Sequence, residues 1–124
     1  MKSMRPMQLW VELATTPAQR ERGLMDRTTE SSMLFLFAQS MMTPFWNERT
    51  LLPLDIFFID PSGTIVTRLA MQSITESQWP LEYRPTAPYV AALELPRGLV
   101  PREVTHLSLG PIDYPHNVAI VTLT

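Results

Sequence analysis

Asp55 is the residue whose position most requires a chemical explanation, because it is the one charge in the apolar run Leu54–Ile59. Such a run is typical of a strand that is buried on both faces. An ionised carboxylate buried there without a partner costs several kcal/mol, so we expect a cation or backbone amides beside it. The candidate partners are Arg49, Arg68, Arg84 and the backbone amides of residues 49–52. Asp55 is then either half of a structural ion pair or a group that orients a ligand or acts as a base.

Glu94 has the same character, since it is the one charge in the run Tyr89–Leu95. If its strand neighbours that of Asp55, the two carboxylates could share a cleft. Two carboxyl groups are the smallest catalytic set for glycoside hydrolysis, which requires roughly 5 to 9.5 Å between them. The alternative is a structural role, in which Glu94 bonds to the backbone near Gly98 or lies at a rim.

Aromatic side chains offer the walls of a binding pocket. Phe45, Trp46, Trp79, Tyr83 and Tyr89 could form a platform on which a sugar or an apolar ligand stacks. Alternatively, these residues complete the hydrophobic core. The predicted ligand-binding residues are Asp55, Phe45, Trp46, Arg49, Trp79, Tyr83, Arg84 and Glu94.

The other reactive residue types do not form a familiar catalytic set. The chain has no cysteine, which excludes thiol chemistry, disulfides and thiolate metal sites. His106 and His116 are the only histidines and lack a metal-ligand spacing, so we expect no metal and no cofactor. The chain has neither a Gly-x-Ser-x-Gly turn nor a glycine loop for phosphate. We therefore assign no catalytic residue and favour a non-catalytic protein over an enzyme.

The charge pattern bears on partners and compartment. A net charge of −2, with both signs mixed along the chain, gives nucleic acid or anionic lipid little to bind. No stretch approaches the ~20 apolar residues of a membrane-spanning helix, so we expect no membrane insertion. The prediction is a soluble protein, cytoplasmic as it stands, or secreted or periplasmic if a leader has been removed. Its oligomeric state is left open.

The elements that position these residues begin with a predicted strand, Met7–Ala14, and a short helix. Thr16 is the expected N-cap, Pro17 takes the first helical position and Gln19 completes a capping box. Gly23 then provides the left-handed stop. One short helix near residues 16–23 follows, and we expect it to lie on the sheet.

Apolar patterns predict the remaining strands. They fall at residues 33–37, 54–59, 64–71, 89–95, 105–109 and 118–123. A type I turn at residues 60–63 makes a hairpin of two of these strands. Residues 72–88 are predicted to be a long loop without secondary structure, which is uncommon unless the loop has a function.

About six to seven short strands and one short helix make a mainly β domain. The expected architecture is a small sandwich or a partly closed barrel, because a sheet that is apolar on both sides needs another covering layer. A βαβ alternation is not evident. The length fits a single domain over residues 1–124, with residues 1–6 and 124 expected to be disordered.

Several spaced motifs occur in one order along the chain. They are Glu21–Met25, Met33–Phe35, Phe45–Trp46, Pro53–Asp55, Asp60 with Gly63, and Leu93–Pro96 with Gly98. This pattern resembles the domain of unknown function 192 (DUF192) family, over nearly the whole chain. The resemblance implies a mainly β domain, often secreted or periplasmic in relatives, with no established reaction. The chain departs from the family at Ser32, in residues 47–50, and in having no cysteine in its long loop.

Three hypotheses for the function follow. The first is a non-catalytic small-ligand binding or accessory domain, with an aromatic-lined pocket beside Asp55 and a small molecule such as a sugar as its ligand. The second is a hydrolase that uses Asp55 and Glu94 as a carboxylate pair. The third is a protein–protein interaction domain, which predicts an exposed apolar patch rather than a concave pocket.

Overall fold

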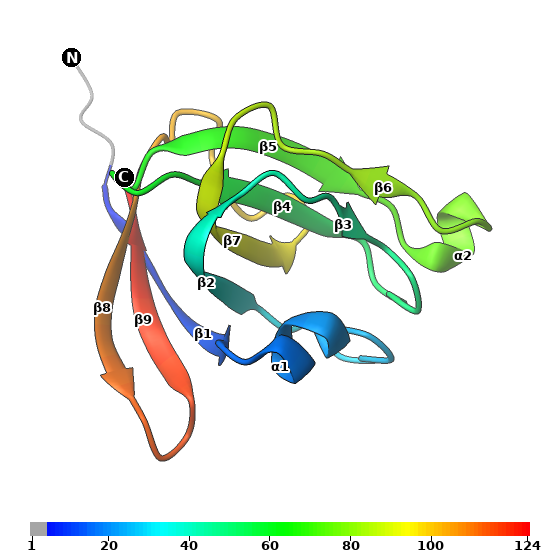
Figure 1. Ribbon diagram of the computed structural model, residues 1–124, viewed down its shortest axis with the longest axis horizontal. Helices are drawn as coiled ribbons and strands as arrows, with labels where there is room; N and C mark the ends of the chain where they lie inside the picture. Colours follow the sequence, from blue (N-terminus) through cyan, green and yellow to red (C-terminus); the bar gives the residue numbers. More distant parts are fainter. Residues whose placement is uncertain (1–4) are drawn as a thin grey trace.

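The computed structural model describes residues 5–124 and shows a curled seven-stranded sheet with a two-stranded sheet beside it (Figure 1). The strands of the large sheet are β1 (Met7–Ala14), β2 (Met33–Met41), β4 (Leu54–Ile59), β5 (Ile65–Met71), β7 (Tyr89–Pro96), β8 (Leu107–Asp113) and β9 (Val118–Leu123). Their order across the sheet is β5-β4-β7-β2-β1-β9-β8. The small sheet pairs β3 (Phe45–Trp46) with β6 (Glu82–Tyr83), and the helices are α1 (Pro17–Arg22) and α2 (Ile74–Ser77).

The two edges of the large sheet approach each other at one end. Thr64, just before β5, forms an isolated antiparallel bridge with His106, just before β8. Leu107 N donates to Gly63 O and Ile65 N donates to Thr105 O, both at 2.8 Å. Because these contacts join the first and last strands of the order, the sheet curls into a partly closed barrel. The predicted mainly β architecture is therefore confirmed.

Both faces of the central strands are buried, which explains the continuous apolar run of β4. Phe57 and Ile59 face a core cluster that also draws on β1, β2, β7 and β9. Since β4 and β9 are not neighbours in the sheet, this cluster fills the space enclosed by the curl. Ile56 and Phe58 face a second cluster, which includes residues of β2 and β7 and the segment after α1. The outer face of β4 is thus covered as well.

Helix α1 forms as its sequence predicts, but its connection was not foreseen. Thr16 Oγ1 accepts from Gln19 N at 3.1 Å, and Gln19 Oε1 accepts from Thr16 N at 3.2 Å, which completes the capping box. Gly23 ends the helix with φ +49°. The flanking strands β1 and β2 then pair in parallel. The chain therefore contains one βαβ unit, contrary to our prediction, because the short helix still leaves enough chain for a crossover.

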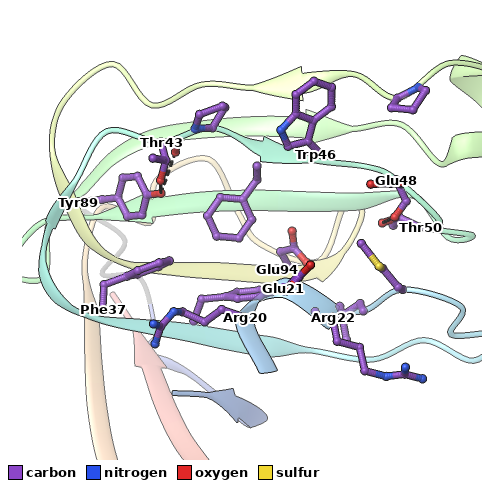
Figure 2. A pocket seen from close by; sticks show the side chains of 17 residues that line it. Arg20, Glu21, Arg22, Phe37, Thr43, Trp46, Glu48, Thr50, Tyr89 and Glu94 are labelled. Carbon is purple, nitrogen blue, oxygen red and sulfur yellow. Dashed lines mark hydrogen bonds between the residues drawn. The ribbon is translucent and has the colours of Figure 1, made fainter. Parts of the chain in front are cut away.

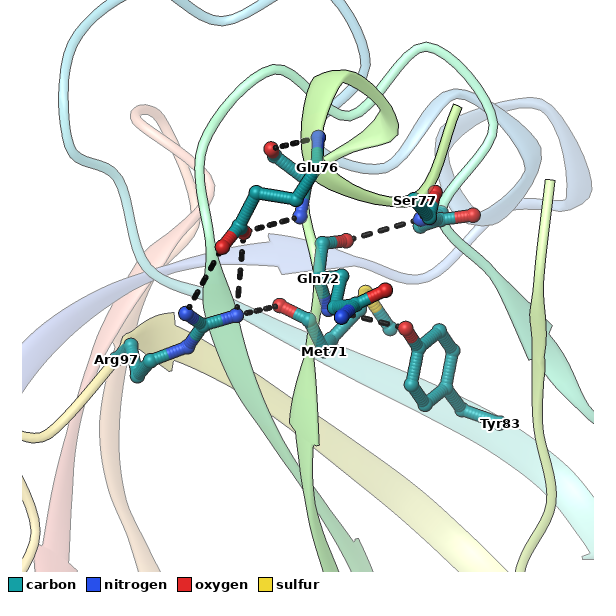
Figure 3. A network of polar contacts seen from close by, with 8 residues as sticks. Met71, Gln72, Glu76, Ser77, Tyr83 and Arg97 are labelled. Carbon is teal, nitrogen blue, oxygen red and sulfur yellow. Dashed lines mark hydrogen bonds and ion pairs between the residues drawn. The ribbon is translucent and has the colours of Figure 1, made fainter. Parts of the chain in front are cut away.

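Residues 72–88 are not a featureless loop. Ser73 and Glu76 form a second capping box that starts α2, and β6 follows within the same segment. Figure 3 shows how the segment is fastened: Arg97 Nη2 donates to Met71 O at 2.9 Å and to Glu76 Oε1 at 3.3 Å. The prediction of a loop without secondary structure was wrong, because it could not include the pairing of β6 with the distant β3.

The chain ends also bear on the predictions. Most of the stretch expected to be disordered at the start of the chain, residues 1–4 of 1–6, lies outside the described residues. At the other end, Thr124 N donates to His106 O at 3.0 Å, and Thr124 O accepts from Thr105 N and His106 N. Within residues 5–124, no helix is long and apolar enough to span a membrane.

Candidate functional site

A pocket of about 540 Å³ opens on the outer face of the large sheet, between the strands β2 and β7 and the covering segments α1 and β3. We call it the Glu94 pocket. Its lining comprises residues 20–25, Phe35, Phe37, residues 43–46, Glu48, Thr50, Pro80, Tyr89 and Glu94. Most of its lining surface is apolar. Its size is within the range usual for small-molecule sites, which is about 300–1,000 Å³.

Aromatic rings make the apolar wall of the Glu94 pocket. The ring of Phe45 lies edge-on to that of Phe35, with 4.9 Å between centroids, and 6.4 Å from that of Phe37. Phe37 in turn lies edge-on to Tyr89 at 5.4 Å. Phe58, in the core behind the wall, is 5.7 Å from Phe45 and 4.9 Å from Tyr89. Such edge-to-face contacts hold the rings in fixed orientations.

Tyr89 contributes its ring to the pocket while its hydroxyl group is already bonded. The hydroxyl donates to Thr43 O at 2.7 Å and lies 3.0 Å from the Thr43 hydroxyl, which donates to it (Figure 2). Burial raises the pKa of Tyr89, while the hydrogen bond to Thr43 acts in the opposite direction. Tyr89 therefore stays neutral and serves as a positioned aromatic surface.

Arg20 lines the pocket, and one nitrogen of its guanidinium group is bonded to the backbone. Its Nη1 donates to Thr15 O at 2.7 Å and to Leu36 O at 3.0 Å. Its guanidinium group lies 5.0 Å from the centroid of the Phe37 ring, a cation–π contact. Arg20 therefore orders the wall around Phe37 and does not neutralise an acid inside the pocket.

Glu94 is the one charged residue of this pocket that is buried, with 5% of its surface exposed. It faces Met33 of β2 and Ile56 of β4 across the ladder, so apolar side chains surround its stem. Figure 2 shows its carboxyl group directed into the pocket. Within residues 5–124 no side chain or amide donates a hydrogen bond to it, and burial alone raises the pKa of Glu94 to about 8. The group is thus mostly neutral at pH 7.

The Glu94 carboxyl oxygens touch the pocket space and are not sealed inside the protein. Every fully enclosed polar side-chain atom in the described part of the chain has a hydrogen-bond partner. Since the Glu94 oxygens have none, they must be in contact with the open volume of the pocket. A bound molecule could therefore reach them directly.

Asp55 lies elsewhere and has a structural partner. Its Oδ2 accepts from Gly98 N at 2.9 Å and lies 3.9 Å from Arg68 Nη2. Arg68 was among the expected partners, whereas the amide is that of Gly98 and not one of residues 49–52. Arg68 also donates to the carbonyl oxygens of Val100 and Pro101. Asp55 and Arg68 thus fasten the connection between β7 and β8.

The two buried acids do not form a pair. Asp55 is opposite Leu95 and Ile56 is opposite Glu94 in the ladder between β4 and β7. Because partners in a ladder point to the same side and successive residues alternate, Asp55 and Glu94 lie on opposite faces of the sheet. The carboxylate pair expected for a hydrolase is not formed. The bond predicted between Glu94 and the backbone near Gly98 is made by Asp55 instead.

The remaining predicted residues are spread over the surface. Arg49 pairs with Asp26, and Arg84 pairs with Glu82. Trp79 is 74% exposed and does not line the pocket. Tyr83 pairs with Phe45 between β6 and β3, and its hydroxyl accepts from Gln72 N at 3.0 Å (Figure 3). Of the eight predicted residues, the pocket brings together Phe45, Trp46 and Glu94.

Sequence reasoning missed several residues of the pocket. Phe35 and Phe37 were assigned to a buried strand, although their spacing of two residues places them on one face and could have indicated a shared wall. Thr43 lay in a segment that had no assignment. Gly23 was predicted as a helix stop but also makes room for the wall, since a Cβ there would lie 3.2 Å from the ring of Phe35.

This arrangement favours binding over familiar catalysis. A neutral carboxylic acid can donate one hydrogen bond, and the ionised form can accept several from a cationic ligand. Among the residues that the structure describes, no group of three or more His, Asp and Glu side chains is placed to hold a metal ion. A raised pKa would also suit a general acid, and the other carboxylates of the lining, Glu21 and Glu48, are exposed residues.

Comparisons with known proteins place the chain in a family. The profile of DUF192, described as "Uncharacterized ACR", matches residues 2–106. A crystal structure of a "putative transcription regulator" from Sinorhizobium meliloti 1021 is similar, with 37% identity and a TM-score of 0.61 over 71% of this chain and 68% of that chain. A protein of unknown function from Novosphingobium aromaticivorans DSM 12444 shares 31% identity, with a TM-score of 0.59 over 72% of this chain and 64% of that chain. No curated protein matches. The family match spans most of the chain and agrees with the motifs in the sequence, and the chain therefore belongs to the DUF192 family.

Proposed function

We propose that this protein is a non-catalytic small-ligand-binding domain whose ligand occupies the Glu94 pocket. The observation that carries the proposal is the Glu94 carboxyl group, which is buried, has no partner within residues 5–124, and is directed into a cavity of about 540 Å³. An acid held in apolar surroundings lowers the stability of the fold. Such unfavourable placements concentrate at functional sites, where a ligand supplies what the protein lacks.

The composition of the lining supports the same proposal. Fixed aromatic rings with a small number of polar groups are typical of sites that bind most of a small molecule's surface. The competing hydrolase hypothesis loses support because Asp55 and Glu94 lie on opposite faces of the sheet. An interaction domain would be expected to present a flat apolar patch, whereas the feature described above is concave.

Trp46 and Trp79 provide a matched pair of variants for the test. Both side chains are at least half exposed, but Trp46 lines the Glu94 pocket and Trp79 does not. A thermal-shift screen with sugars, amines and small carboxylates, followed by calorimetric titration, would be run on wild type, Trp46→Ala and Trp79→Ala. A ligand at roughly 100 times its Kd should stabilise the fold by about 3 kcal/mol, which raises the Tm by several degrees.

The two variants should then separate. We expect Trp46→Ala to weaken binding by about tenfold, a loss of about 1.4 kcal/mol, and Trp79→Ala to bind like wild type. The proposal fails if no compound in the screen stabilises the wild type. It also fails if every hit binds equally to all three proteins, because the site would then lie elsewhere.

A further inference from the structure

The charges around the Glu94 pocket leave its buried acid without a cation. The lining contains three glutamates, Glu21, Glu48 and Glu94, and two arginines, Arg20 and Arg22, so its net charge is −1 when Glu94 is ionised. Arg20 already donates to two backbone carbonyl oxygens, those of Thr15 and Leu36. Only burial shifts the pKa of Glu94, with no contribution from a neighbouring positive charge. Among residues 5–124, no cation is therefore placed to neutralise the ionised form of Glu94, and a bound ligand could supply one.

We propose that the Glu94 pocket binds an organic cation, with an alkylammonium group against the Glu94 carboxylate and an apolar body against the rings of Phe35, Phe37, Phe45 and Tyr89. This proposal rests on the proposed function and adds the chemical class of the ligand. An ammonium group donates charge-assisted hydrogen bonds to the carboxylate oxygens. Aromatic faces attract the same positive charge, most strongly where water is excluded.

The structure itself contains one instance of that attraction. The guanidinium group of Arg20 lies over the ring of Phe37, 5.0 Å from its centroid, at the edge of the same pocket. One ring of this wall is therefore already in contact with a cation. A neutral polyol could bond to the protonated Glu94 but would not stabilise its ionised form, and an anionic ligand would disfavour that form further through like-charge repulsion.

Binding of an ammonium ion by this site must release a proton near neutral pH. The free pocket holds Glu94 as the acid, and the complex holds a carboxylate beside the ammonium group, so the carboxylic proton passes to the buffer. The titratable and charged groups around Glu94 are Arg20, Glu21 and Arg22 from α1, Glu48 from the segment after β3, and Tyr89 from β7 itself. Tyr89 keeps its proton in the bond to Thr43 O. Glu94 is thus the group that supplies the proton.

Three indole compounds test the charge of the ligand at nearly constant shape. Tryptamine is a primary ammonium ion, tryptophol is its neutral analogue and indole-3-acetate is an anion. Benzylamine and spermidine extend the ammonium set to smaller and longer molecules. Titration calorimetry in phosphate and in HEPES at pH 7, neither of which contains a primary ammonium group, reports affinity and, from the difference in heat between the two buffers, the number of protons released. The proteins are wild type, Glu94→Gln, and Asp55→Asn as the control for a buried acid on the opposite face.

The expected result is that at least one ammonium ion binds wild type about tenfold or more tightly than tryptophol, with close to one proton released at pH 7. Its affinity should rise with pH up to about pH 8 and should fall to that of tryptophol in Glu94→Gln. Asp55→Asn should bind like wild type.

Other outcomes overturn the proposal. If tryptophol or indole-3-acetate binds as tightly as every ammonium ion, or if Glu94→Gln binds ammonium ions unchanged, the pocket is not a cation site. If no ammonium ion binds at all, the cation proposal is also wrong. Failure of the ammonium ions alone leaves the proposed function standing, because the wider screen with sugars and carboxylates and the two tryptophan variants test it separately. Proton release by wild type is measured without any variant, so the test does not depend on the folding of Glu94→Gln.

Discussion

The substitution Glu94→Gln should stabilise this protein at neutral pH, although it alters a buried residue. Burial raises the pKa of Glu94 from 4.5 to about 8, so the folded state holds a proton that the unfolded state has lost between these values. The free energy of unfolding of the wild type is therefore unaffected by this acid below pH 4.5. It falls by about 1.4 kcal/mol for each pH unit as the pH rises from 4.5 toward 8. Glutamine has nearly the same shape and does not titrate.

The size of the effect follows from the same two pKa values. At pH 7 the wild type lies about 2.5 units above the unfolded pKa, which corresponds to a loss of about 3 kcal/mol relative to the neutral isostere. Above pH 8 the difference should level off near 5 kcal/mol, and at pH 4 it should vanish. A domain of this kind has a total stability of only about 5–15 kcal/mol, so these differences are large.

Urea denaturation of both proteins at several pH values between 4 and 8.5 measures this difference. Acids with lowered pKa values, such as Asp60 and Glu76, make the free energy of unfolding rise with pH in both proteins. Their contribution therefore cancels when the two proteins are compared. Glu21→Gln, which removes a carboxylate from the exposed rim of the same pocket, controls for the change in net charge. A difference between wild type and Glu94→Gln that is independent of pH, or one that grows toward low pH, would refute the argument.

Three further substitutions test the supports of the fold. Asp55→Ala removes the acceptor of the Gly98 amide and should destabilise the fold by about 1–3 kcal/mol in urea denaturation, with ligand affinity unchanged. An effect on affinity instead would contradict its structural role. Asn47 is fully buried and bonds to Gln72 O, Ser77 Oγ and Leu81 N, so Asn47→Ala should cost about 1–3 kcal/mol and loosen Pro80 at the pocket wall. Unchanged hydrogen exchange at residues 72–82 would argue against this. Gly23→Ala places a Cβ 3.2 Å from Phe35 at φ +49° and should lower the Tm through a loss of about 1–3 kcal/mol; an unchanged Tm would show that the turn relaxes freely.

The local elements of this fold were predictable because they depend on neighbours in the chain. The capping box around Thr16 and Gln19 specifies α1 within a few residues, and the turn at Asp60 specifies the hairpin of β4 and β5. The apolar run of β4 likewise predicted a strand that is buried on both faces. The prediction for residues 72–88 failed because strand β6 forms by pairing with β3, which lies far away in the sequence.

The sequence by itself determined that two acids, Asp55 and Glu94, sit alone in apolar strands, and it could not distinguish their roles. Only the tertiary structure decided this, through the register of β4 against β7, which turns the two side chains to opposite faces. On one face Asp55 accepts a hydrogen bond from the Gly98 amide and lies near Arg68. On the other face Glu94 lines a cavity walled by aromatic rings and has no hydrogen-bond partner among residues 5–124. The physical reason is that strand register depends on contacts between distant segments, and a shift of one residue exchanges every side chain between the two faces.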